Sequence, residues 1–193
     1  MTGEESRLAV LIMAAGESRR FGSCKLLADI DGKPMLQRSI ELAQSTDASL
    51  TRIVTGRWHQ EIEQAQNSGL IDAIDLIYNP DWKQGLGSSI ATGVSQIASL
   101  CDEALILLAD QVRVSSEDLE QLTLRDDRSQ IACASYSKTL GPPAIFPAQF
   151  FPQLEKLSGD KGAKKLLSEL TITDCQIDIP RAAFDIDVPA DLT

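Results

Sequence analysis

The chain has 193 residues, of which 43% are apolar and 24% charged, a composition typical of a folded domain with a sizeable core. Its 28 acidic and 18 basic residues give a net charge of −10, which opposes nonspecific binding to nucleic acid or to an anionic membrane. Four scattered cysteines without a C-x-x-C pair argue against a zinc site and against a disulfide framework.

The overall organisation follows from the absence of certain segments. No linker rich in Pro, Gly or Ser divides the chain, so we expect one domain over residues 1–193. The first residues are acidic and carry no apolar signal core, and no apolar run reaches the roughly 20 residues of a membrane helix. We therefore expect a cytoplasmic protein whose partner is a small molecule rather than a nucleic acid or a membrane.

The first predicted element is a strand over residues 8–14, because this run is unbroken and apolar, as in a central parallel strand covered on both faces. A loop with glycines, Arg19, Arg20 and Lys25 follows at the carboxyl end of this strand, where open α/β sheets bind ligands. Free backbone N–H groups and cations form an anion cradle, which predicts a polyphosphate ligand. The spacing fits neither a P-loop nor G-x-G-x-x-G. The alternative is a glycine-rich connection with solvated cations.

The loop also carries a specific resemblance. Its sequence is Leu11-Ile12-Met13-Ala14-Ala15-Gly16-x-Ser18-x-Arg20-Phe21-Gly22-x-x-Lys25. This pattern resembles the signature loop of the MobA-like nucleotidyltransferases, most closely that of the molybdenum cofactor cytidylyltransferases. The resemblance implies that the loop wraps a nucleotide triphosphate, with Arg20 and Lys25 as catalytic cations on the phosphates. The nucleotide-binding residues it implies here are Ala14, Ala15, Gly16, Ser18, Arg20, Gly22 and Lys25.

Residues 26–78 show alternating helix and strand patterns. Pro34 is predicted to open a helix as its first residue. Residues 51–56 and 74–78 are predicted strands, and residues 62–66 belong to a helix between them. This alternation predicts a parallel sheet with right-handed crossovers.

A polar, glycine-broken loop over residues 79–89 leads into the next predicted helix. Ser88 or Ser89 is predicted at the helix N-cap, where a hydroxyl either caps the helix or contacts a ligand. The pattern Asn79-Pro80-x-Trp82-x-x-Gly85-x-x-x-Ser89 resembles the segment around the nucleotide base in these transferases. The resemblance assigns Gly85, Ser88 and Ser89 to base recognition, whereas Trp82 is open to a second interpretation as a lid over the core.

The second strongly apolar strand, residues 104–109, ends in Asp110 and Gln111. A carboxylate at this edge of the sheet is well placed to hold a metal that bridges phosphates. Its alternative role as a helix N-cap is weak, because the next helix begins near Ser115. Residues 108–111 resemble the magnesium motif of the family, with Val112 in place of the usual proline. The predicted cofactor is Mg²⁺, with Asp110 as a catalytic metal ligand.

The following elements are a helix over residues 116–124 and a strand over residues 130–136. Residues 141–146 resemble a turn and antiparallel edge strand of the family. The glycine-rich turn over residues 159–163 opens a helix over residues 164–170 and lines the acceptor side in relatives, which implies acceptor-side roles for Gly159, Asp160 and Gly162. Lysines at this helix start suit an anionic acceptor or are simply solvated.

The C-terminal stretch, residues 184–192, resembles the motif D-I-D-T-P-x-D-L, with Val188 in place of Thr. Asp185 and Asp187 alternate on an extended segment, so both point to one side and either could meet Asp110. We favour Asp187 as the second metal ligand. His59, the only histidine, has no partner motif, and we expect it to serve packing.

These features together predict an α/β fold, a Rossmann-like doubly wound and mostly parallel sheet of the nucleotide-diphospho-sugar transferase type. The resemblance implies that CTP and molybdopterin-bound molybdenum give molybdopterin cytosine dinucleotide and pyrophosphate, with a molybdoenzyme or its chaperone as partner. Ala15 favours CTP, because guanylyl-transferring relatives usually have glycine there and a Cβ crowds a purine. The alternatives are a transferase of the same fold that uses GTP or another phosphorylated acceptor, and a noncatalytic protein that delivers molybdenum cofactor.

Overall fold

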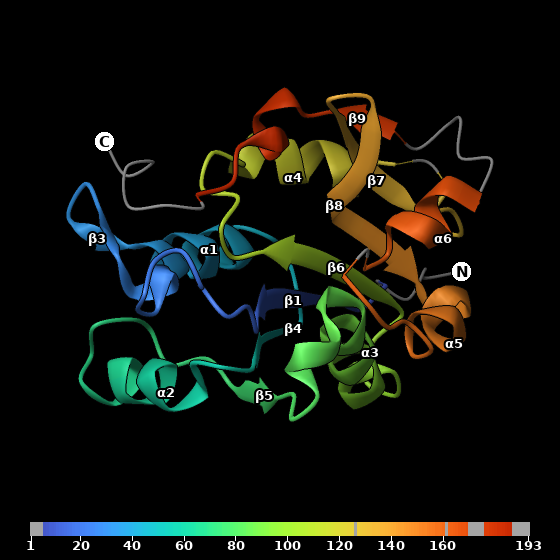
Figure 1. Cartoon of the computed structure of the whole chain (residues 1–193). Coiled ribbons are helices and arrows are strands. Elements are labelled where there is room, and N and C mark those ends of the chain that lie inside the picture. The colour runs from blue at the N-terminus through green and yellow to red at the C-terminus, as the bar shows by residue number, and fades with distance from the viewer. Residues whose placement is uncertain (1–5, 126, 161, 170–175, 187–193) are drawn as a thin grey trace.

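A computed structural model describes residues 6–125, 127–160, 162–169 and 176–186 of the chain. Its centre is a seven-stranded sheet with the strand order β5-β4-β1-β6-β8-β7-β9 (Figure 1). The strands of this sheet are β1 (Leu8–Ala14), β4 (Leu50–Thr55), β5 (Leu76–Tyr78), β6 (Glu103–Leu108), β7 (Ala132–Tyr136), β8 (Thr139–Pro147) and β9 (Gln176–Asp178). A separate hairpin consists of β2 (Asp29–Ile30) and β3 (Lys33–Pro34).

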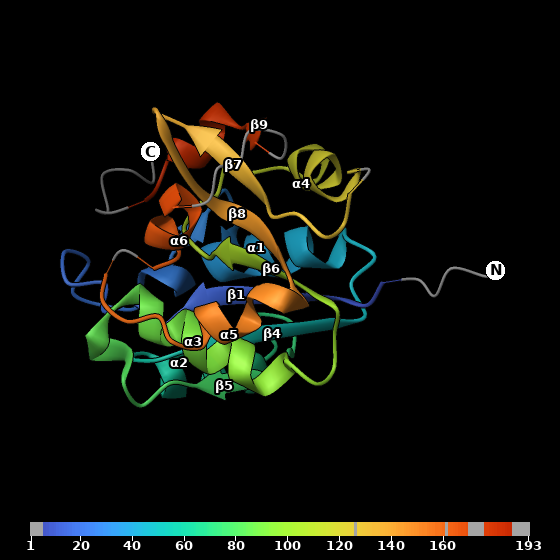
Figure 2. The ribbon, with the colours of Figure 1, turned by 90° about the vertical axis from the view of Figure 1, so that its right-hand side faces the viewer.

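Helices cover both faces of the sheet, as a doubly wound fold requires. They are α1 (Met35–Gln44), α2 (His59–Asn67), α3 (Leu86–Ile97), α4 (Ser116–Thr123), α5 (Phe151–Leu154) and α6 (Lys164–Glu169). Helices α3, α5 and α6 lie in front of the sheet in Figure 2, and their apolar side chains belong to one core layer. The apolar side chains of α1, α2 and α4 belong to the other layer. Among the described residues, no helix is long and apolar enough to cross a membrane.

Strand β1 lies at the centre of the fold, as its sequence predicts. It pairs in parallel with β4 on one side and with β6 on the other, and all of its residues are buried. Successive β1 side chains alternate between the two core layers, because neighbouring residues of a strand point to opposite faces. A strand covered in this way needs apolar residues at every position, which explains the unbroken run in the sequence.

Strand β8 confirms one prediction and corrects another. It is antiparallel, as expected for residues 141–146, but it lies between β6 and β7 and is therefore not an edge strand. Its prolines fit an interior strand because the pairing register with β7 shifts between Cys133 and Ala134, so that Pro142 and Pro143 lie at an irregularity. A proline lacks an N–H donor and is tolerated at such a bulge.

The remaining predicted elements are present with small shifts in their bounds. Helix α1 begins at Met35, so Pro34 is its N-cap residue rather than its first residue. Pro34 also pairs with Asp29 in the small hairpin, and this pairing holds it outside the helix. In α4 the N-cap is Ser115, whose side chain accepts from the Asp118 N–H in a capping box.

Candidate nucleotide site

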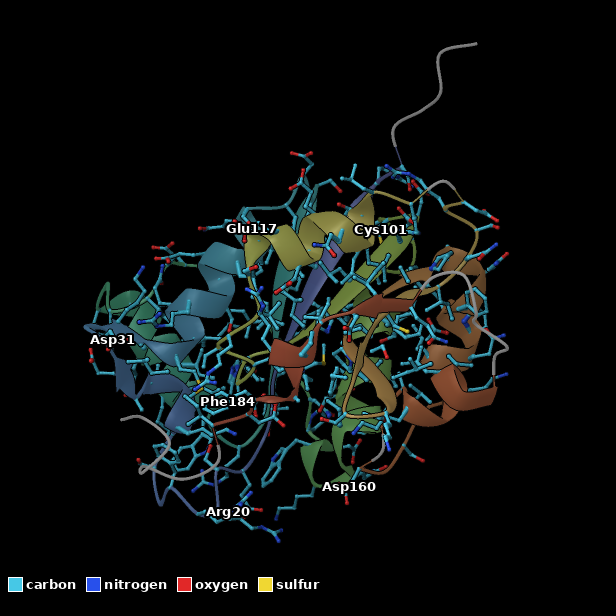
Figure 3. All side chains as sticks on the ribbon, turned by 90° about the horizontal axis from the view of Figure 1, so that it is seen from above. Arg20, Asp31, Cys101, Glu117, Asp160 and Phe184 are labelled. Carbon is cyan, nitrogen blue, oxygen red and sulfur yellow. The ribbon has the colours of Figure 1, made fainter. Side chains whose placement is uncertain are left out.

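The described part of the chain has a pocket of about 580 Å³ at the carboxyl ends of β1 and β6. Figure 3 shows Arg20 and Asp160 at this end of the molecule and Cys101, which precedes β6, toward the opposite end. The loop over residues 15–25, called the glycine loop below, and the start of α3 supply most of the pocket wall. The lining residues are Met13, Ala14, Ala15, Gly16, Glu17, Ser18, Arg19, Arg20, Lys25, Leu26, Trp82, Lys83, Gly85, Leu86, Ser89, Leu108, Asp110 and Asp160.

The conformation of the glycine loop is fixed by two residues with positive φ and by hydrogen bonds, one of them from a tryptophan side chain. Ser18 has φ 54° and Gly22 has φ 70°, so the chain turns through the left-handed region at both residues. The Phe21 N–H donates to the Ser18 carbonyl at 2.9 Å. The Trp58 indole N–H donates to the Glu17 carbonyl at 3.0 Å, which ties the loop to the segment after β4. These contacts leave the pocket side of the loop for a ligand.

Lys25 and Asp110 meet in the pocket, although they are far apart in the sequence. The Lys25 Nζ lies 2.7 Å from the Asp110 Oδ2, and it also donates to the Ile186 carbonyl at 2.8 Å. Both side chains are partly buried, with exposed fractions of 12% and 25%. The C-terminal segment therefore reaches the end of β6, as expected. Asp187, the predicted second metal ligand, lies outside the described residues.

Gln111 holds three segments together next to Asp110. Its buried Nε2 donates to the Pro142 carbonyl at 3.0 Å and to the Ala182 carbonyl at 2.7 Å. Both amide hydrogens are therefore used inside the protein. Because Gln111 directly follows Asp110, these bonds fix the end of β6 against β8 and against the C-terminal segment.

The start of α3 corrects the prediction for Ser88 and Ser89. The N-cap residue is Gly85 rather than either serine, and both serines lie inside the helix and are buried. Gly85 has φ 96°, and a Cβ there would lie 2.5 Å from the Asp160 Oδ1. Only glycine fits this position, so the helix begins at the glycine and the serines follow it.

Most of the predicted site residues line the pocket, and some do not. Gly22, Ser88, Gly159 and Gly162 are absent from its wall, although the Gly159 carbonyl accepts from the Gly87 N–H at 2.9 Å and so supports α3. Trp82 and Lys83 also line the pocket, although neither was predicted as a site residue. The sequence signal that could have indicated them is the motif over residues 79–89, which contains both. His59 is not part of the pocket wall: its ring centre lies 5.0 Å from that of Tyr78, and its Nδ1 lies 2.7 Å from the Thr55 Oγ1.

Few side chains in the described part of the chain are placed to bind a metal ion at the pocket. Within the described ranges, no three His, Cys, Asp or Glu side chains gather closely enough to hold a metal ion. Asp110 is the aspartate at the carboxyl end of β6, and its carboxylate faces Lys25 in the pocket. One carboxylate suits Mg²⁺, which is usually bound through one or two carboxylates together with substrate phosphates and water.

Comparison with known proteins identifies the family. The model of the MobA-like NTP transferase domain matches residues 10–174, which include most of β1, the glycine loop and all of β6. The chain belongs to the MobA-like NTP transferase family. It is accordingly a nucleotidyltransferase with a nucleotide-binding, Rossmann-like domain.

Relatives of this MobA-like transferase have diverse names. This chain is 30% identical over 162 residues to the purine catabolism protein PucB of Bacillus subtilis. The matched region covers 81% of this chain and 78% of PucB. This chain is also 25% identical over 178 residues to the nicotine blue oxidoreductase of Paenarthrobacter nicotinovorans. That match covers 86% of this chain and 85% of the oxidoreductase. The structure of Rv0371c from Mycobacterium tuberculosis H37Rv, in complex with manganese, has a TM-score of 0.78, 19% identity and 96% coverage of both chains.

Proposed function

We propose that the protein transfers CMP from CTP to the terminal phosphate of a molybdopterin-type acceptor and releases pyrophosphate. The observation that carries this proposal is the meeting of Lys25 and Asp110, 2.7 Å apart, beside a glycine loop that opens onto a pocket of about 580 Å³. A cation, a carboxylate and free backbone N–H groups are the groups that a nucleotide triphosphate with its metal requires.

The metal in this proposal is a divalent cation, Mg²⁺, held by Asp110 and by Asp187. Asp110 fits because its carboxylate lines the pocket and oxygen is the ligand atom that a hard cation prefers. The manganese complex of Rv0371c is consistent with a divalent cation in this fold. When bound, such an ion neutralises phosphate charge and orients the triphosphate.

The transfer itself needs positioning more than proton transfer. An oxygen of the acceptor phosphate attacks the α-phosphorus, and the bond from the α-phosphorus to the oxygen of the leaving pyrophosphate breaks. The attacking oxygen is already anionic, so no general base is required. Lys25 and Arg20 place positive charge beside the triphosphate and stabilise the negative charge that builds up on the leaving group.

Ala15 supports the choice of CTP. It is buried with an exposed fraction of 7%, and it lines the pocket between β1 and the glycine loop. Its Cβ narrows the space beside the backbone and therefore crowds a purine more than a pyrimidine. One methyl group contributes about 1–3 kcal/mol of discrimination, so Gly85 and Ser89 at the start of α3 are assigned the rest.

The test is a screen of the four nucleoside triphosphates with molybdopterin as acceptor, in which pyrophosphate and the dinucleotide product are both measured. We expect cytosine dinucleotide and one pyrophosphate per turnover. A guanine dinucleotide would instead indicate the GTP-using alternative. Binding of the cofactor without pyrophosphate release would indicate delivery of the cofactor to a molybdoenzyme, and turnover with a different phosphorylated acceptor would identify that acceptor.

A further inference from the structure

Asn79, which directly follows β5, has a side chain whose orientation is fixed by its neighbours. It is fully buried, with an exposed fraction of 0%. Its Oδ1 accepts from the Asp81 backbone N–H at 2.9 Å, and its Nδ2 donates to the Ser88 and Ser89 hydroxyl oxygens at 2.8 and 3.0 Å. A backbone N–H only donates, so the amide oxygen must face Asp81 and the amide N–H groups must face the serines.

The two serines use their own hydroxyl protons differently. Ser88 donates to the Asp81 carbonyl at 2.9 Å, so its donor is used inside the protein. Ser89 accepts from Asn79, and in the part of the chain that the structure describes its hydroxyl proton has no acceptor. Ser89 is 2% exposed and lines the pocket, whereas Ser88 does not line it. A buried donor without a partner costs about 1–3 kcal/mol, which a ligand acceptor would relieve.

We propose that Asn79 is a positioning residue that makes Ser89 a hydrogen-bond donor to an acceptor atom of the bound base. This inference rests on the proposed function, which places a cytosine beside α3. Cytosine has two acceptors on its pairing edge, the ring nitrogen N3 and the carbonyl oxygen O2. Guanine has N–H donors at N1 and N2 on the same edge and a single acceptor, O6. A serine that presents its proton therefore favours the cytosine edge, and Asn79 maintains that polarity by occupying a lone pair of the serine.

The experiment measures equilibrium binding of CTP, in the presence of Mg²⁺, by isothermal titration calorimetry. The variants Ser89→Ala and Ser88→Ala form a matched pair, because each removes one hydroxyl that accepts from Asn79. We expect both to lower the melting temperature. Ser89→Ala should weaken CTP binding about tenfold, as expected for a lost hydrogen bond of roughly 1.4 kcal/mol, and Ser88→Ala should weaken it less.

Two CTP analogues test the contact from the ligand side. In 3-deaza-CTP the N3 acceptor is replaced by C–H, and in 2-thio-CTP the O2 acceptor is replaced by sulfur, a weaker acceptor. We expect one analogue to bind about tenfold more weakly than CTP to the unmodified protein and about equally to Ser89→Ala. Asn79→Asp offers acceptors to both serines, so the Ser89 proton turns away from the ligand. This variant should also lose the preference for CTP over that analogue.

The outcomes separate the inference from the proposed function. If the unmodified protein binds CTP but neither analogue depends on Ser89, the positioning role of Asn79 is wrong and the proposed function stands. If the unmodified protein does not bind CTP, the proposed function fails and the inference fails with it. If Asn79→Asp does not fold, the comparison of Ser89→Ala with the two analogues decides, because it needs no change at Asn79.

Discussion

At the scale of single residues, the pocket depends on a lysine with partners from distant parts of the chain. Lys25 contacts Asp110, at the end of β6, and the backbone carbonyl of Ile186. The ammonium group thus joins the glycine loop, the central sheet and the C-terminal segment. A bound triphosphate would compete for the same ammonium group, which makes Lys25 the residue whose removal is most informative.

Lys25→Ala should lower the turnover of CTP by about a hundredfold to a thousandfold, because it removes a cation that stabilises charge on the leaving pyrophosphate. Steady-state kinetics measure this effect, and circular dichroism should show an intact fold. Lys33→Ala is the control, because Lys33 pairs with Glu41 at the surface and does not line the pocket. Undiminished turnover in Lys25→Ala would remove Lys25 from the mechanism.

Asp110→Asn should raise the magnesium concentration needed for half-maximal rate by roughly tenfold or more, because a neutral amide is a poorer ligand for a hard cation than a carboxylate. A magnesium titration of the rate measures the change. Asp102→Asn is the matched control, since Asp102 is an exposed partner of Arg7 at the opposite end of β6. Identical titrations of Asp110→Asn and the unmodified protein would exclude Asp110 as a ligand.

Ala15→Gly should lower the ratio of the CTP to the GTP efficiency, kcat/KM, by about tenfold, because it removes the methyl group that crowds a purine. Added backbone freedom from glycine affects both substrates, so the ratio and not either rate is the diagnostic quantity. The measurement is a competition between the two nucleotides. A ratio that stays constant or rises would mean that the base is selected elsewhere, at Gly85 and Ser89.

At the scale of elements, the start of α3 is set by contacts that are remote in sequence. The Gly85 backbone passes close to Asp160, and the Gly87 N–H donates to the Gly159 carbonyl at 2.9 Å. The turn over residues 159–160 therefore supports the nucleotide side of the pocket. These contacts explain why local N-cap preferences pointed to the wrong residue, and the acceptor-side role of Gly159 stays a prediction.

Gly85→Ala should destabilise the protein more than Gly69→Ala. Both glycines have positive φ, 96° and 75°, so both alanines incur a backbone penalty. The penalty is larger at Gly85, because its ψ of −176° places it in a region that is essentially restricted to glycine. At Gly69 nothing lies within 4 Å of an added Cβ, whereas at Gly85 the Asp160 Oδ1 would be 2.5 Å away. Urea unfolding measures the difference, which we expect to exceed about 1 kcal/mol, and only Gly85→Ala should raise the KM for CTP. Equal destabilisation would argue against the contact.

The sequence predicted some of these elements well because their signals are local. Strands β1 and β6 are buried on both faces, so their apolar runs are continuous and easily recognised. Lys25 and Asp110 were expected at the same sheet edge, since each follows such a strand. The interior position of β8 was not predicted, because it depends on pairing with two distant strands. The Asn79 hydrogen bonds were not predicted either, because they depend on side-chain orientation.

At the scale of the whole molecule, each core layer contains a buried thiol that resists ionisation. Cys24 lies in the layer with α1, and Cys101 lies in the layer with α3. Burial raises the pKa of each thiol to about 11. Neither thiol forms a disulfide within the part of the chain that the structure describes. Cys175 lies outside that part. The interior therefore favours the neutral thiol over the thiolate.

The free energy of unfolding should consequently fall as the pH rises from 9 to 11. A raised pKa in the folded state means that the unfolded chain loses these protons first, so the stability present below pH 9 is lost as the pH rises through the pKa of about 11. Each thiol contributes on the order of 2 kcal/mol. Urea unfolding at several pH values measures the slope. The double variant Cys24→Ala, Cys101→Ala should have a shallower slope, and an unchanged slope would contradict this account.

The central position of β1 also has a consequence for synthesis on the ribosome. Its neighbours are β4, at residues 50–55, and β6, at residues 103–108, so the first strand to be translated gains its second neighbour only after more than half of the chain has been made. At ordinary elongation rates this delay is about 5–20 s. During that time the apolar residues 8–14 have an open edge that could pair with another nascent chain.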